Sequence, residues 1–90
     1  MKFEWDRVKA AANLKKHGVS FQEAATVFGD PLATTHNDPD HSYDEHRFIT
    51  FGMSLSGRLI MVSHADRGDV VRIISARLMT AKEKELYEED

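Results

Sequence analysis

Val70-Val71-Arg72-Ile73-Ile74-Ser75-Ala76-Arg77 is the most strand-like stretch of the chain. It is rich in β-branched residues and lies between a turn signal, Arg67-Gly68-Asp69, and a helix-start signal at Thr80, so it predicts a strand buried on at least one face. Strict alternation puts Arg72 on one face of that strand and Arg77 on the other. An arginine is rarely buried without a partner, so each is expected to reach solvent, a carboxylate or a phosphate.

Two further strands are predicted immediately before this one, from Arg47 to Ser54 and from Arg58 to His64. Turn residues separate all three, so the pattern predicts an antiparallel meander. The Arg-Gly-Asp tripeptide at 67–69 is interpreted as a hairpin turn and not as an adhesion motif. A last helix is expected from Thr80 to about Glu88, because Thr80 and Glu83 have the spacing of a capping box.

The N-terminal half predicts a short strand at Phe3-Glu4-Trp5 and two helices. Asp6 is suited to cap a helix from Arg7 to Lys16, and Gly18 to end it. A second helix starts at Ser20, where Glu23 suggests another capping box, and Gly29-Asp30-Pro31 ends it. A further strand from Leu32 to His36 is expected. The fold class is therefore a small single α+β domain spanning residues 1–90.

Composition limits the function classes. The chain has 90 residues, no cysteine and a net charge of −3, so a disulfide framework or a zinc site built on sulfur is excluded. The sequence shows neither a membrane-length apolar run nor a signal-peptide pattern, which predicts a cytoplasmic protein without membrane contact. The negative charge argues mildly against nucleic acid as a partner, but basic residues concentrate in 2–21 and 58–77, which leaves room for a local basic face.

The segment from His36 to His46 is the most polar part of the chain. Counting Asp38 as position 1 of a calcium loop, position 6 is Tyr43 and position 12 is Ile49, so the EF-hand pattern fails. A histidine–carboxylate metal site built from His36, Asp38, Asp40 and His41 stays open as a minor alternative, against a solvated connecting loop.

The candidates for chemistry on the predicted sheet are the cationic residues Arg47, His64, Arg72 and Arg77, together with Glu45 and Glu83. Arginine forks bind phosphate bidentately, and a histidine beside them can move protons while a ribose 2′-hydroxyl attacks the adjacent phosphorus. Such a reaction needs a base, an acid and charge stabilisation, and no metal. The pattern by itself is not specific, because many small α/β domains carry a few polar residues on their strands.

The chain contains six recognisable motifs: Phe3-Glu4-Trp5-Asp6, the run from Asn13 to Phe21, Asp30-Pro31, Arg47-Phe48 with Gly52, Gly57-Arg58-Leu59, and Arg72 to Arg77 followed by Glu83 and Tyr87. Together these motifs resemble the BrnT family of bacterial toxins from type II toxin–antitoxin modules. The resemblance implies a RelE-like fold and a metal-independent endoribonuclease, without cofactor, that inhibits translation. It also implies a BrnA antitoxin whose ribbon-helix-helix dimer, and not the toxin itself, binds operator DNA.

Residue roles follow from this resemblance as expectations. Arg72 and Arg77 are expected to hold the scissile phosphate, His64 to move a proton, and Arg47 to stabilise developing charge. The residues expected to bind RNA are Lys9, Lys15, Lys16, His17 and Arg58. Two other function classes stay open: a catalytically inactive module that only binds the antitoxin, and a small metal-dependent hydrolase.

Overall fold

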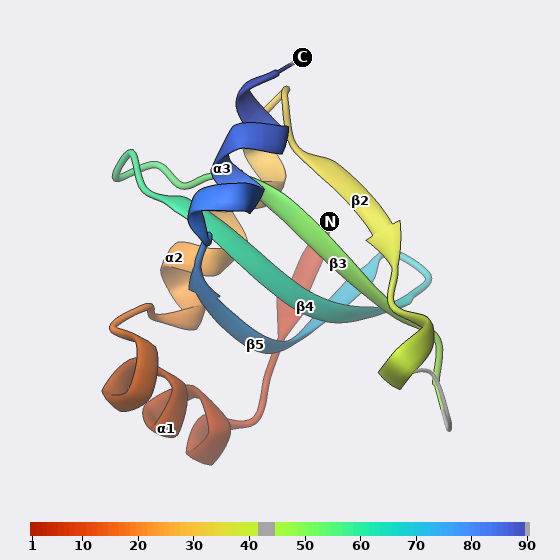
Figure 1. Ribbon diagram of the computed structural model, residues 1–90. Coiled ribbons are helices and arrows are strands. Elements are labelled where there is room, and N and C mark those ends of the chain that lie inside the picture. Colours follow the sequence, from red (N-terminus) through yellow and green to blue (C-terminus); the bar gives the residue numbers. More distant parts are fainter. Residues whose placement is uncertain (42–44, 90) are drawn as a thin grey trace.

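The computed structural model describes residues 1–41 and 45–89, which form a five-stranded sheet with helices on both faces. In the order β1-β5-β4-β3-β2, only the outer β1 is parallel to its neighbour. Figure 1 shows α3 in front of the sheet and α2 behind it. The elements are β1 (Lys2–Glu4), α1 (Arg7–His17), α2 (Phe21–Thr26), η1 (Val27–Gly29), β2 (Thr34–Asn37), η2 (Pro39–His41), β3 (Arg47–Met53), β4 (Leu59–Arg67), β5 (Val70–Leu78) and α3 (Ala81–Glu88).

The predicted meander is confirmed as β3, β4 and β5, joined by short turns. Strand β4 is longer than expected: it continues through Arg67, so the last hairpin turn is confined to Gly68 and Asp69. Its register with β5 shifts at one point, where Ser63 lies opposite Ser75 while His64 lies opposite Ile73. Ile74 is therefore the extra residue of a β-bulge, which resets the alternation of side chains along β5.

The core lies between the sheet and the α1–α2–η1 layer. Phe21, Ala24 and Val27 pack there against sheet residues such as Val62 and Ile73, all with no more than 2% of their surface exposed. Gly52 of β3 is required by this packing, because an added Cβ would come within 2.7 Å of Val27 Cγ1. The predicted apolar side of the second helix is thus confirmed.

Helix α1 attaches to the sheet mainly through a polar side chain. Its residues Val8 and Leu14 are 79% and 51% exposed, whereas Asn13 is buried. The Asn13 amide donates to the carbonyls of Val19 (3.0 Å) and Ala76 (2.8 Å), and its oxygen accepts from the Ala76 amide (3.1 Å). Strand β1 pairs with β5 only as far as Arg72, so it leaves the backbone N–H and C=O of Ala76 without a partner strand. The Asn13 side chain satisfies both of these groups.

The helix ends follow the sequence signals with one exception. Asp6 caps α1, Gly18 ends it at φ 68°, and Thr80 with Glu83 forms the predicted capping box of α3. Ser20 also accepts from the Glu23 amide, but the Glu23 carboxylate does not return to the Ser20 backbone. It binds Arg58 instead, so that capping box is only half formed. No helix in residues 1–41 and 45–89 is long and apolar enough to cross a membrane.

Candidate functional site

The face of the sheet turned away from α1 and α2 carries Arg47, Arg72 and Arg77, and we call it the arginine face. Val71, Ile73 and Ala76 of β5 point into the core on either side of the bulge. Arg72 and Arg77 therefore both point the other way, although strict alternation placed them on opposite faces. The bulge at Ile74 is the physical reason for this correction.

Strand register places two of these arginines in one row. Arg47 of β3 lies opposite Ala65 of β4, and Ala65 lies opposite Arg72 of β5. With adjacent strands about 4.8 Å apart, the two arginine Cα atoms are roughly 10 Å from each other across a small residue, within reach of a shared anion. Arg77 lies opposite Met61, four residues before Ala65 on β4, so the bulge leaves it about 13 Å from Arg72 at about 3.3 Å per residue. Its guanidinium binds Glu83 of α3, which places it to contact a neighbouring phosphate.

Each arginine of this face is paired with a glutamate. Arg47 lies 3.8 Å from Glu45, Arg72 lies 3.4 Å from Glu4, and Arg77 binds both oxygens of Glu83 at 2.8 and 3.0 Å. The hydrogen bonds between the last pair hold the pKa of Glu83 below its usual value and raise that of Arg77. All three arginine side chains are 30–34% exposed, so an anion can reach them from solvent.

His64 lies on the opposite face of the sheet from the arginines and is 1% exposed. Its ring packs against Phe28 and Phe48, while its two nitrogens contact Asp66 Oδ1 and Thr50 Oγ1, both at 2.7 Å. The structure thus does not bring His64 together with Arg47, Arg72 and Arg77. Its expected role as proton carrier for that group has no geometric support, because the sheet separates the side chains.

Arg58 is also occupied elsewhere. Its Nε donates to Glu23 at 2.9 Å, its second terminal nitrogen contacts the other Glu23 oxygen, and the same nitrogen donates to the Gly18 carbonyl at 2.9 Å. Ser54 and Ser56 donate to the same carboxylate, and we call these four side chains the Glu23 cluster. These donors, with Arg58 first, lower the pKa of Glu23 to about 2. Arg58 therefore connects the β3–β4 turn to α2 instead of pointing toward the arginine face.

The other residues expected to bind RNA lie on α1. Lys9, Lys15 and Lys16 are exposed, and His17 is half-buried. Helix α1 packs beside β5 on the core side of the sheet, so these cations do not line the arginine face. Lys15, Lys16 and His17 lie in the last turn of α1, where cations interact favourably with the helix dipole, whereas Lys9 lies near its start.

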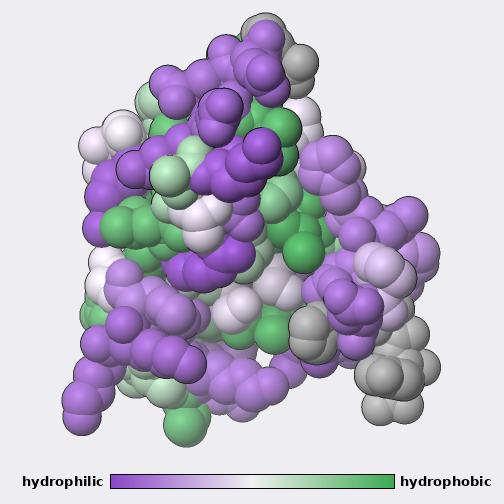
Figure 2. All heavy atoms as spheres, in the orientation of Figure 1, coloured by the Kyte–Doolittle hydropathy of each residue, from purple (hydrophilic) through white to green (hydrophobic). Residues whose placement is uncertain are grey.

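His36, Ser63 and Ser75 belong to the arginine face although the sequence did not single them out for it. Register places His36 opposite Ile49, Ile49 opposite Ser63, and Ser63 opposite Ser75, one row above Arg47 and Arg72. Figure 2 shows this face with near-neutral and hydrophobic side chains in its middle and hydrophilic ones around them. Only the pairing register reveals this row, since neither serine belongs to a recognisable motif.

Within the described part of the chain, the metal-ligand candidates of the polar segment do not converge. In residues 1–41 and 45–89, no three His, Asp or Glu side chains form a metal-binding group. His36 contacts Phe51 and Thr34, whereas Asp38 is buried and Asp40 exposed. The His41 side chain and residues 42–44 lie outside the described part of the chain.

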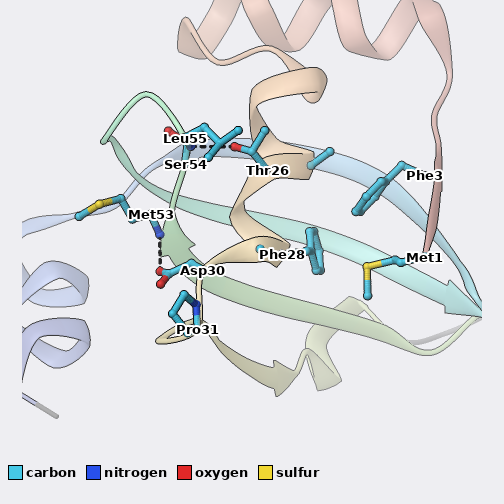
Figure 3. Close-up of a pocket in the computed structure, with 11 residues that line it drawn as sticks. Met1, Phe3, Thr26, Phe28, Asp30, Pro31, Met53, Ser54 and Leu55 are labelled. Carbon is cyan, nitrogen blue, oxygen red and sulfur yellow. Dashed lines mark hydrogen bonds between the residues drawn. The ribbon is translucent and has the colours of Figure 1, made fainter.

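A cavity of about 510 Å³ lies on the other side of the molecule, beside α2 and η1 (Figure 3). Met1, Phe3, Phe28, Met53 and Leu55 give it a largely apolar lining. The one carboxylate in its wall, Asp30, already accepts from the backbone amides of Met53 and Leu32 and from the Tyr87 hydroxyl. This cavity therefore offers little acid–base or phosphate-binding chemistry.

Comparison with known proteins points to one family. The family model of BrnT, the ribonuclease toxin of a type II toxin–antitoxin system, matches residues 5–83. The crystal structure of the Brucella abortus ribonuclease toxin BrnT superimposes with a TM-score of 0.64 at 23% identity, covering 89% of this chain and 97% of that one. No curated protein matches the chain.

Proposed function

Because the chain belongs to the BrnT family of ribonuclease toxins from type II toxin–antitoxin systems, we propose that it cleaves RNA on its arginine face and thereby inhibits translation. The observation that supports this site is the β-bulge at Ile74, which leaves Arg47, Arg72 and Arg77 on one face. Guanidinium groups are suited to phosphodiesters because their paired N–H groups match two phosphate oxygens.

In the proposed reaction, Arg47 and Arg72 hold the scissile phosphate from both sides of Ala65. The ribose 2′-oxygen attacks the phosphorus, its proton passes to a base, and the bond to the 5′-oxygen breaks as that oxygen receives a proton. The products are a 2′,3′-cyclic phosphate and a 5′-hydroxyl. The two arginines stabilise the charge that develops on the phosphoryl oxygens, and Arg77 binds an adjacent phosphate.

The acid–base groups nearest to this pair of arginines are carboxylates. Glu45 and Glu4 each lie beside one of the two guanidinium groups. An incoming phosphate would replace the carboxylate as the arginine's partner. Glu4 would then be free to accept the 2′-hydroxyl proton, whereas Glu45 would keep its contact with Arg67 at 3.3 Å. We assign no role to His64, since its imidazole is buried on the far face.

The proposal includes no metal and no cofactor. It includes cytoplasmic action and neutralisation by a BrnA-type antitoxin, through which alone operator DNA is contacted. A second candidate is favoured by the glutamate pairing itself: arginines already neutralised by Glu4, Glu45 and Glu83 also suit an inactive module whose one task is to bind the antitoxin.

RNA cleavage by the purified protein in EDTA tests the proposal. Wild type should cleave, and Arg47→Ala or Arg72→Ala should lower the rate by about 100- to 1,000-fold, as expected for loss of one charge-stabilising group. Arg7→Ala, which removes an exposed arginine from α1, is the matched control and should keep full activity. Cleavage only with added divalent metal would support the hydrolase alternative. No cleavage by folded protein under either condition would support the binding module.

A further inference from the structure

A second cavity lies on the arginine face itself, between α3 and the β2–β3 edge of the sheet. It measures about 250 Å³ and is lined by Thr34, His36, Phe51, Glu83, Leu86 and Tyr87. Cavities that hold drug-sized ligands usually measure about 300–1,000 Å³, so this one suits a single flat ring system. In Figure 2, hydrophobic atoms gather in the recess between α3 and β2.

The lining has the character of a stacking site. The rings of His36 and Phe51 meet edge to face with centroids 6.0 Å apart, and Tyr87 contributes a third ring. Proteins bind unpaired nucleic-acid bases by stacking them on such side chains, since every base has a π-face. The His36 side chain is exposed, so the stacking surface is reachable from solvent.

Glu83 connects this cavity to the arginines. Its Oε1 accepts from Arg77 and from the Thr80 amide, whereas Oε2 accepts from Arg77 alone among the described groups, which leaves a lone pair for a base amino or imino group. Since Arg77 and the cavity share this carboxylate, a phosphate on Arg77 would lie next to the cavity. A single nucleotide has a phosphate and a flat base next to each other, so it matches Arg77 and the neighbouring cavity.

We propose that this cavity binds one RNA base next to the phosphate held by Arg77, and that it determines which nucleotide is placed beside the cleaved bond. The inference rests on the proposed ribonuclease function and adds a recognition site to it. His36 and Phe51 stack on the base, and Glu83 accepts a hydrogen bond from its edge.

A non-cleavable probe tests the inference without requiring catalysis. A 2′-O-methyl RNA trinucleotide and the same trinucleotide with one abasic sugar are titrated into the ¹⁵N-labelled protein, placing the abasic sugar at each position in turn. Loss of the bound base should weaken binding to wild type by about 5- to 150-fold at one position, the range that about 1–3 kcal/mol of stacking corresponds to. The amide signals of Thr34, His36 and Phe51 should shift only with the intact base.

His36→Ala should reduce the difference between the intact and abasic probes, and Phe51→Leu should do the same where it folds. His46→Ala is the matched control, because His46 is also exposed and stacked on a phenylalanine, Phe48, but lies outside the cavity. That variant should keep the full difference. Equal binding of intact and abasic probes to wild type would overturn the proposal, as would cavity shifts that appear only with the antitoxin.

Cleavage of the corresponding 2′-hydroxyl RNA is followed in parallel. Base-dependent binding without cleavage would support the cavity assignment and contradict the ribonuclease. Cleavage without base-dependent binding would support the ribonuclease and contradict the cavity assignment. The absence of cleavage and of base-dependent binding would overturn both proposals.

Discussion

Glu23→Gln tests whether the Glu23 cluster holds the fold together. In the native chain the Glu23 carboxylate accepts from Arg58, Ser54 and Ser56, and so ties α2 to the β3–β4 turn across more than 30 residues of sequence. Glutamine has nearly the same shape but no charge, and one of its two terminal atoms donates where the carboxylate accepts. The substitution should therefore destabilise the protein.

The magnitude follows from the pKa of Glu23. A fall from 4.5 to about 2 corresponds to a ceiling of about 3 kcal/mol for the free energy that favours the ionised form in the folded chain. Arg58 is 39% exposed and Glu23 17% exposed, so solvent screens part of this interaction. We therefore expect Glu23→Gln to lower the free energy of unfolding by about 1–2 kcal/mol at pH 7.

The pH dependence identifies the cause. A carboxyl group whose pKa is lower in the folded than in the unfolded chain stabilises the fold above its ordinary pKa, and that contribution is lost as the pH falls through the folded pKa. The difference in the free energy of unfolding between wild type and Glu23→Gln should be constant above about pH 5 and shrink between about pH 4.5 and 2. Urea unfolding at a series of pH values measures it.

Glu85→Gln is the matched control, because it makes the same change at an exposed position of α3 and should alter stability little. A Glu23→Gln difference below about 0.3 kcal/mol at pH 7, or one that does not change down to pH 2, would refute the assignment. Arg58→Lys should cost a similar amount of stability while leaving the RNA affinity of the folded protein nearly unchanged. A large loss of RNA affinity would instead restore Arg58 as an RNA contact.

Three further predictions concern other contacts. Asn13→Ala should destabilise the fold by about 2–4 kcal/mol, because it leaves the Ala76 amide and carbonyl unpaired. A loss of stability in thermal unfolding that is no larger than that of Leu14→Ala would contradict this. Deletion of Ile74 should give a folded protein with a regular β4–β5 ladder and Arg72 and Arg77 still on one face, as NMR contacts across the ladder would show; a molten spectrum would count against the bulge. Tyr87, whose hydrogen bond to Asp30 and partial burial raise its pKa to about 12, should ionise near that pH in an ultraviolet titration, and Asp30→Asn should move it toward 10.

Local sequence patterns were sufficient for the element types and most of their ends. The turn at Gly68, the caps at Asp6 and Thr80 and the stop at Gly18 each depend on hydrogen bonds or backbone angles within a few residues. The same holds for the apolar side of α2. These features are local, so they can be predicted before the chain is folded.

The composition of the arginine face depended instead on tertiary structure. Alternation along β5 separated Arg72 from Arg77, and the bulge that reunites them exists only in the pairing of β5 with β4. The same pairing brings Arg47 into one row with Arg72. A single strand carries no information about which of its residues its neighbour skips, so this site could not be assembled from the sequence.

The partners of individual polar residues were likewise decided by packing. His64 had the chemistry of a proton carrier, but its strand position turns it into the core against Phe28, where Asp66 and Thr50 occupy both nitrogens. Glu23 had the spacing of a capping box, but Arg58, 35 residues away, offers a charged donor pair that a backbone amide cannot match. The sequence by itself determined the residue types, the elements and the local caps, whereas the side of the sheet and the choice of partner came from contacts between distant segments.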